Sequence, residues 1–147
     1  MSKFTFIVLC AVAASVSKVN ADEDLHAAFH EAIKPIMEEC SKEHGVSPDE
    51  IQSAQKTGNA EGIKPCFLGC VFKKAEILNS KGDYDVDTAL TKVRKFIKDD
   101  EQYAKLAEIG KQCTSVNDKA VSDGEAGCEK AALLATCFLE HKGKIPI

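Results

Sequence analysis

The sequence predicts an all-α fold, in which six helices form one domain and are cross-linked by disulfide bonds. Apolar residues recur every three or four positions along most of the chain, as in helices that bury one face, and no segment alternates as a strand would. Seven cysteines are present, and six of them follow a segment with the composition of a secretory signal peptide. An even number of cysteines in a secreted chain indicates disulfides.

The signal segment covers residues 1–21. A short, positively charged start precedes an uncharged apolar run at residues 4–16, and Ala21 closes a group of modest side chains that suits signal peptidase. We expect cleavage after Ala21, which leaves residues 22–147 as a single domain and removes Cys10. A membrane anchor is the alternative, but an anchor needs about 20 apolar residues and this run is shorter.

The net charge argues against nucleic acid as a partner. Cleavage changes it from −4 to about −6, because the signal segment carries two lysines and no acidic residue. Nucleic-acid-binding domains present a basic face, and so do proteins that bind anionic membranes. We therefore expect neither kind of partner.

The first three helices are predicted from apolar spacing and capping residues. Ser47, Pro48 and Glu50 have the order of an N-cap, a first-turn proline and a capping-box acid, so the second helix begins there. The third helix is expected from Pro65 to about Asn79. The first helix precedes both, and its buried face is marked by Leu25, Phe29, Ile33, Ile36 and Cys40.

A turn at residues 81–83 separates the third helix from a fourth, which begins near Asp85. Asp99 can cap a fifth helix that runs to Cys113. The apolar stripe of the fourth helix consists of Val86, Leu90, Val93 and Ile97.

The sixth helix is expected after a polar loop at residues 114–123. Ser122 and Glu125 have capping-box spacing, so this helix begins near them and runs to about His141. Residues 142–147 cannot continue it and form a C-terminal tail. We interpret His141 as an exposed histidine favoured by the helix dipole, in preference to a pH switch that would release the tail.

Geometry limits how the six cysteines can pair. Cys66 and Cys70 lie one turn apart on the third helix, where their Cβ atoms would be about 5–6 Å apart, whereas a disulfide needs about 3.5–4.5 Å. Cys128 and Cys137 lie on opposite sides of the sixth helix. All four therefore bond elsewhere and tie helices together, although spacing alone leaves the choice of partners open.

The cysteine spacing resembles that of the six-cysteine insect odorant-binding proteins. The series Cys40-x25-Cys66-x3-Cys70-x42-Cys113-x14-Cys128-x8-Cys137 has the short x3 and x8 gaps of that family on either side of a long gap. The resemblance covers essentially all of residues 22–147. It implies a compact six-helix domain with three interlocked disulfides enclosing an apolar cavity. It also implies the pairing, which is Cys40–Cys70, Cys66–Cys128 and Cys113–Cys137.

The resemblance implies a function as well. The expected protein is a secreted carrier of small hydrophobic ligands, such as odorants or pheromone-like molecules, in an extracellular fluid such as sensillum lymph. A carrier of other hydrophobic molecules in other secretions is an alternative that the sequence does not separate. A membrane chemoreceptor and a second copy of the chain are further candidate partners, and no cofactor is implied.

In the resembling family, the inner faces of the first, third, fourth, fifth and sixth helices line the cavity. Any single residue on these faces could equally be ordinary core. Tyr84, Tyr103 and Thr136 are candidates for the polar group that would orient a ligand, and the sequence does not choose between them. The expected wall residues are Phe29, Ile33, Met37, Leu68, Phe72, Leu90, Val93, Ile97, Leu106, Leu134 and Phe138, with Ile145 and Ile147 from the tail.

Two other functions fit the sequence less well. Secreted phospholipases need a His-Asp dipeptide and serine hydrolases of the α/β type need a Gly-x-Ser-x-Gly elbow; neither motif is present, so we expect no catalytic residues. A membrane-active saposin-like module has closely paired cysteines near both ends, whereas Cys40 has no near neighbour. No Cys-x-x-Cys pair is present, so no metal site is expected either.

The tail is apolar enough to close the mouth of a cavity, because Ile145 and Ile147 flank Pro146. Deleting residues 143–147 is expected to weaken ligand binding, since the deletion removes this part of the wall. Displacement of a fluorescent probe measures the effect. Unchanged affinity would rule out the tail as a lid.

Overall fold

The computed structural model describes residues 27–57 and 59–141, and this part of the chain is all-α, as the sequence predicts. The first helix is described from residue 27 to residue 44. Between α5 and α6 lie two short 3-10 helices, η1 (Cys113–Asp118) and η2 (Gly124–Ala126). No helix in the described ranges is both long enough and apolar enough to cross a membrane. The other α-helices are α2 (Pro48–Thr57), α3 (Pro65–Lys74), α4 (Val86–Arg94), α5 (Asp100–Gln112) and α6 (Cys128–Glu140).

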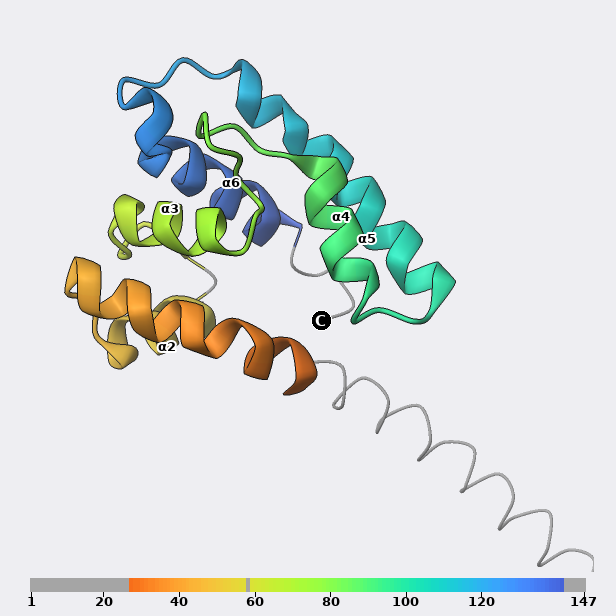
Figure 1. Cartoon of the computed structure of the whole chain (residues 1–147), viewed down its shortest axis with the longest axis horizontal. Helices are drawn as coiled ribbons and strands as arrows, with labels where there is room; N and C mark the ends of the chain where they lie inside the picture. The colour runs from red at the N-terminus through yellow and green to blue at the C-terminus, as the bar shows by residue number, and fades with distance from the viewer. Residues whose placement is uncertain (1–26, 58, 142–147) are drawn as a thin grey trace, which may run out of the picture.

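The helix α3 lies at the centre of this arrangement. It packs mainly against α6, and the first helix lies along its other side (Figure 1). Helices α4 and α5 form an antiparallel pair beside this stack (Figure 1). The buried apolar side chains form two core clusters, one between the first helix and α3 and the other among α4, α5, η1 and α6. Leu68 and Phe72 of α3 contact both clusters, so α3 connects them.

Three disulfides join these elements. Cys40–Cys70 links the first helix to α3, Cys66–Cys128 links α3 to the start of α6, and Cys113–Cys137 links η1 to α6. These are the three pairs that the family resemblance implies. The two cysteines of α3 bond to two different helices. The two cysteines of α6 bond to α3 and to η1, so each disulfide connects separate parts of the fold.

The predicted capping residues of α2 and α5 are confirmed, and Asp85, near which the fourth helix was predicted to begin, caps α4. Ser47 N donates to Glu50 Oε2 at 2.7 Å, and Glu50 N donates to Ser47 Oγ at 3.2 Å, which completes a reciprocal capping box. These hydrogen bonds from Ser47 hold the pKa of the Glu50 carboxyl below its usual range. The Asp85 and Asp99 side chains each accept a backbone N–H from the first turn of the following helix.

The end of α3 was predicted too late. The helix ends at Lys74 and does not reach Asn79, because Glu76 adopts a left-handed conformation with φ of 59°. The N–H of Leu78 then reaches back to the carbonyl of Phe72. Leu78 is 2% exposed, so it is buried like a helical core residue although it lies beyond the helix, in an isolated antiparallel bridge with Tyr84. Because Leu78 is apolar, the helical spacing of apolar residues in the sequence continues past the last residue of α3.

The start of α6 was predicted too early. The capping box expected between Ser122 and Glu125 is wrong, because η2 occupies that stretch and α6 begins at Cys128. Ser122 pairs instead with Glu129: its N donates to Glu129 Oε2 at 3.0 Å, and its hydroxyl donates to the same carboxylate. The 3-10 helix η2 lies between Ser122 and Glu129. Their separation in sequence is therefore larger than the spacing of a capping box. The polar loop expected before this region likewise begins with η1.

Candidate ligand-binding site

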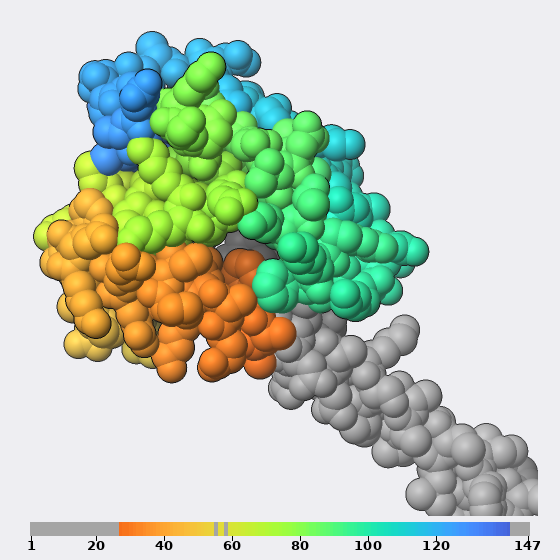
Figure 2. Space-filling model, in the orientation of Figure 1, coloured from red at the N-terminus to blue at the C-terminus, as the bar shows by residue number. Residues whose placement is uncertain are grey.

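The elements that the family resemblance assigns to a cavity wall surround one region of the fold. Figure 2 shows the surface hollowed where the first helix, α3 and α4 meet. Each of these three elements carries expected wall residues, and α5 and α6 carry the others. The question is therefore whether these side chains are packed as core or keep surface that a ligand could cover.

Nine expected wall residues are apolar side chains that the fold only half buries. Packed core residues in this protein keep almost no surface, as the exposed fractions of Phe67 (2%) and Leu134 (0%) show. An apolar side chain that keeps accessible surface inside such a fold fits the wall of a space that the protein does not fill. Five of the nine also pack directly against a core cluster: Ile33, Met37, Leu68, Phe72 and Phe138. The nine, called the wall residues below, are Phe29, Ile33, Met37, Leu68, Phe72, Leu90, Val93, Leu106 and Phe138.

Ring contacts bring distant parts of this region together. The ring of Phe29 meets that of Phe96 edge to face, with 6.0 Å between centroids, so the start of the first helix contacts the end of α4. Phe138 of α6 packs edge to face on Tyr84 at 6.1 Å. Such aromatic pairs add about 0.5–1.5 kcal/mol to simple burial and hold the rings in defined positions.

Four other expected wall residues differ from the nine. Leu134 has no exposed surface and belongs to the cluster among α4, α5, η1 and α6. Ile97 is 2% exposed and follows the end of α4. Both are packed as ordinary core, which is the alternative that the sequence left open. Ile145 and Ile147 lie outside the described residues, and their part in the wall stays a prediction.

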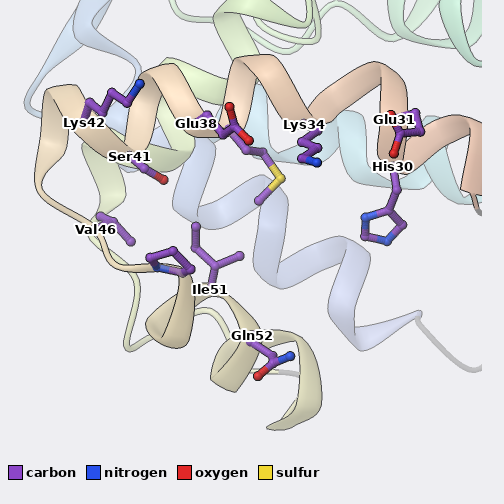
Figure 3. A pocket seen from close by; sticks show the side chains of 11 residues that line it. His30, Glu31, Lys34, Glu38, Ser41, Lys42, Val46, Ile51 and Gln52 are labelled. Atoms are coloured by element: carbon purple, nitrogen blue, oxygen red, sulfur yellow. The ribbon is translucent and has the colours of Figure 1, made fainter.

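A groove lies between the first helix and the start of α2, and Met37 of the wall residues lines it too. It is open to solvent, with a volume of about 690 Å³, and the charged residues of its lining all come from the first helix. Figure 3 shows His30 and Lys34 extending from the first helix toward it, with Ile51 facing them from α2. Sequence reasoning missed this groove because α2 was not among the helices expected to contact a ligand. Its lining residues are His30, Glu31, Lys34, Met37, Glu38, Ser41, Lys42, Val46, Pro48, Ile51 and Gln52.

Two clusters of metal-binding residue types occur in the described part of the chain. One consists of Cys113, Cys137 and His141, and the other of Glu43, His44 and Cys70. The cysteines in both are disulfide-bonded, so they present no thiolate to a metal ion. What remains in each cluster is at most one histidine and one carboxylate, which is too few ligands for a stable zinc site.

One polar side chain is buried beside the wall residues. Tyr84 is 4% exposed, and burial raises the pKa of its phenol from the ordinary value near 10 to about 12. The fold therefore favours the protonated phenol. The stability that this preference contributes is fully present below pH 10 and is lost as the pH rises toward 12.

This pH dependence can be measured with one spectroscopic reporter, because the chain has two tyrosines and no tryptophan. In the variant Tyr103→Phe, Tyr84 is the single tyrosine. Its phenolate absorbance in a rapid pH jump is expected to rise with a midpoint near pH 12. A midpoint near pH 10 in the folded protein would show that the Tyr84 phenol is solvated.

Comparisons with known proteins place the chain in a family. The model of the PBP/GOBP family matches residues 22–141. The B1 protein of Tenebrio molitor is 34% identical over 98 residues, which are 66% of this chain and 69% of that protein. The B2 protein of the same species is 31% identical over 98 residues, which are 66% of this chain and 70% of that protein.

The fold is also that of a solved structure. The odorant-binding protein dmelOBP28a from Drosophila melanogaster superposes with a TM-score of 0.59 and 24% sequence identity, over 78% of this chain and 95% of that one. Together with the six cysteines and the interlocked disulfides, the family match leads to one conclusion: the chain belongs to the PBP/GOBP family and is of the insect odorant-binding protein type.

Proposed function

We propose that the chain is a secreted carrier of small hydrophobic molecules. It binds odorants or other semiochemicals in the apolar space between its helices and transports them through an aqueous fluid such as sensillum lymph. Residues 1–21 direct secretion in this proposal, and cleavage after Ala21 releases the carrier. The chemoreceptor and homodimer partners that the family resemblance implies stay predictions.

The half-buried state of the nine wall residues carries this proposal. They come from the first helix, α3, α4, α5 and α6, so they are widely separated in sequence, and the proposal assigns them to the inner faces of these helices. A ligand that covers their remaining surface removes apolar area from water, which favours binding by about 25 cal/mol per Å². The ligand is therefore expected to be small and mostly apolar.

The chemistry of the wall supports binding over catalysis. All nine wall residues are apolar, so none of them can act as a general acid, a general base or an activated nucleophile. The odorant-binding proteins are likewise a binding family. Three disulfides support a carrier in a different way, because they hold the helices together without requiring that side chains fill the space between them.

Substitution of Val93 by phenylalanine tests whether the wall faces unfilled space. The larger ring would occupy that space, so the affinity for N-phenyl-1-naphthylamine is expected to fall about tenfold or more while Tm stays nearly unchanged. In a packed core the same ring would destabilise the fold by about 1–3 kcal/mol. Probe fluorescence and thermal unfolding measure the two effects.

Leu133→Phe is the matched control, because Leu133 lies on α6 and is 37% exposed. It adds the same kind of ring at the surface and is expected to leave both affinity and Tm unchanged. A Val93→Phe variant that binds the probe normally, or that loses stability as a core variant would, contradicts the proposed site.

A further inference from the structure

The structure separates the three candidates for the polar group that orients a ligand. Thr136 is exposed, and its hydroxyl already donates to the carbonyl of Ala132 at 2.9 Å. The ring of Tyr103 is covered by the guanidinium of Arg94, which lies 4.7 Å from the ring centroid and is itself partly exposed. Tyr84 alone of the three is buried, with 4% of its surface exposed.

The hydroxyl of Tyr84 makes no hydrogen bond to the described part of the protein. The hydrogen bonds that this residue makes within the described ranges belong to its backbone, and no described group bonds to its hydroxyl. Buried tyrosine hydroxyls nearly always have a partner, because an unpaired polar group in an apolar environment is costly. The Tyr84 oxygen is not among the fully covered side-chain atoms that lack a partner in the described ranges, so it keeps a small accessible surface through which a molecule outside the protein can reach it.

A glycine makes room for this hydroxyl among the wall residues. A Cβ atom on Gly110, in the middle of α5, would lie 3.2 Å from the Tyr84 oxygen and 3.5 Å from Cδ2 of Leu90. Glycine lowers the stability of a helix interior, so its presence here needs a local reason, and the space taken by the phenol supplies one. The Tyr84 oxygen and Leu90 therefore both border this point, together with Cγ2 of Val86 at 3.7 Å, while the Tyr84 ring packs on Phe138; Leu90 and Phe138 are wall residues.

The position of Tyr84 is fixed by its backbone. The side chain of Asn117 in η1 accepts from Tyr84 N at 2.8 Å and donates to Tyr84 O at 2.9 Å. The carbonyl of Asn117 in turn accepts from Nζ of Lys130, a residue of α6 that is only 3% exposed, at 3.1 Å. The phenol is therefore held by groups from η1 and α6, as a preorganised binding group must be.

We propose that the Tyr84 hydroxyl donates a hydrogen bond to the polar group of the ligand, so that the protein selects apolar molecules that carry one acceptor, such as a ketone, an aldehyde or an ester. This inference rests on the proposed carrier function. A neutral acceptor fits the site because the wall residues carry no charge that could pair with an ion. The phenol stays protonated in neutral solution and remains a donor there.

A matched pair of ligands tests this hydrogen bond. Undecan-2-one and 2-methylundec-1-ene have nearly the same shape, but the alkene has a methylene group where the ketone has its acceptor oxygen. Each is used to displace N-phenyl-1-naphthylamine from the wild-type protein, from Tyr84→Phe and from Tyr103→Phe. The first substitution removes the proposed donor with little change in volume, and the second removes the other phenol of the chain as a control.

Tyr84→Phe is expected to bind the ketone roughly three- to tenfold more weakly than the wild-type protein, and to bind the alkene equally well. Tyr103→Phe is expected to behave as the wild type. An equal loss of affinity for both ligands would show that Tyr84 contributes only apolar contact. No loss of affinity for either ligand would show that water satisfies the hydroxyl. Each result overturns the inference. If the wild-type protein binds neither ligand, the carrier function itself fails.

A second measurement detects the hydrogen bond directly. In Tyr103→Phe the near-ultraviolet absorbance of Tyr84 is free of other tyrosine or tryptophan signals. Donation of a hydrogen bond by the phenol is expected to shift this absorbance to longer wavelength when the ketone binds, whereas the alkene should cause a smaller change. The same change with both ligands would overturn the inference even if the affinities differed.

Discussion

The fold depends on the two cysteines of α3, which lie one helical turn apart and bond to different helices. Cys70 holds the first helix and Cys66 holds the start of α6, so the central helix is attached covalently on two sides. Cys113–Cys137 closes the third connection, between η1 and α6. A disulfide typically contributes about 2–4 kcal/mol by restricting the unfolded chain, and this contribution does not require close packing between the helices. The cross-links therefore permit an interior that the side chains leave partly open.

The proposed apolar space depends on the residues around it. The nine wall residues keep accessible surface, whereas core residues such as Phe67 have almost none. In the binding that we propose there are two separable parts: apolar burial against the wall, which favours any small hydrophobic molecule, and one directed hydrogen bond from Tyr84, which favours molecules with an acceptor. The structural support of Tyr84 by Asn117 and Lys130 belongs to the second part, because a donor discriminates between ligands only if its position is fixed.

Much of the fold could be predicted from the sequence. Helix caps depend on residues that are close together in the chain, and the spacing of the cysteines can be read directly from it. The predicted caps at Ser47 and Asp99 place two helix starts correctly, and α4 begins next to Asp85 as expected. The predicted end of α3 and the predicted start of α6 were wrong, because tertiary burial of Leu78 and a 3-10 turn before α6 override the local pattern. For the site, the family resemblance indicates the helices, but it does not show which side chains keep surface. That difference separates Leu134 from the wall residues, and it is visible only once the helices are packed.

The central claim is that disulfide-linked helices surround an apolar space that the protein does not fill, and xenon binding tests it most directly. Xenon enters dry apolar cavities and is easily located in crystals. In crystals of the mature protein under xenon pressure, the account predicts xenon in contact with wall residues of α3 and α4, such as Phe72, Leu90 and Val93. An interior without xenon, in which packed side chains occupy the same region, would contradict it.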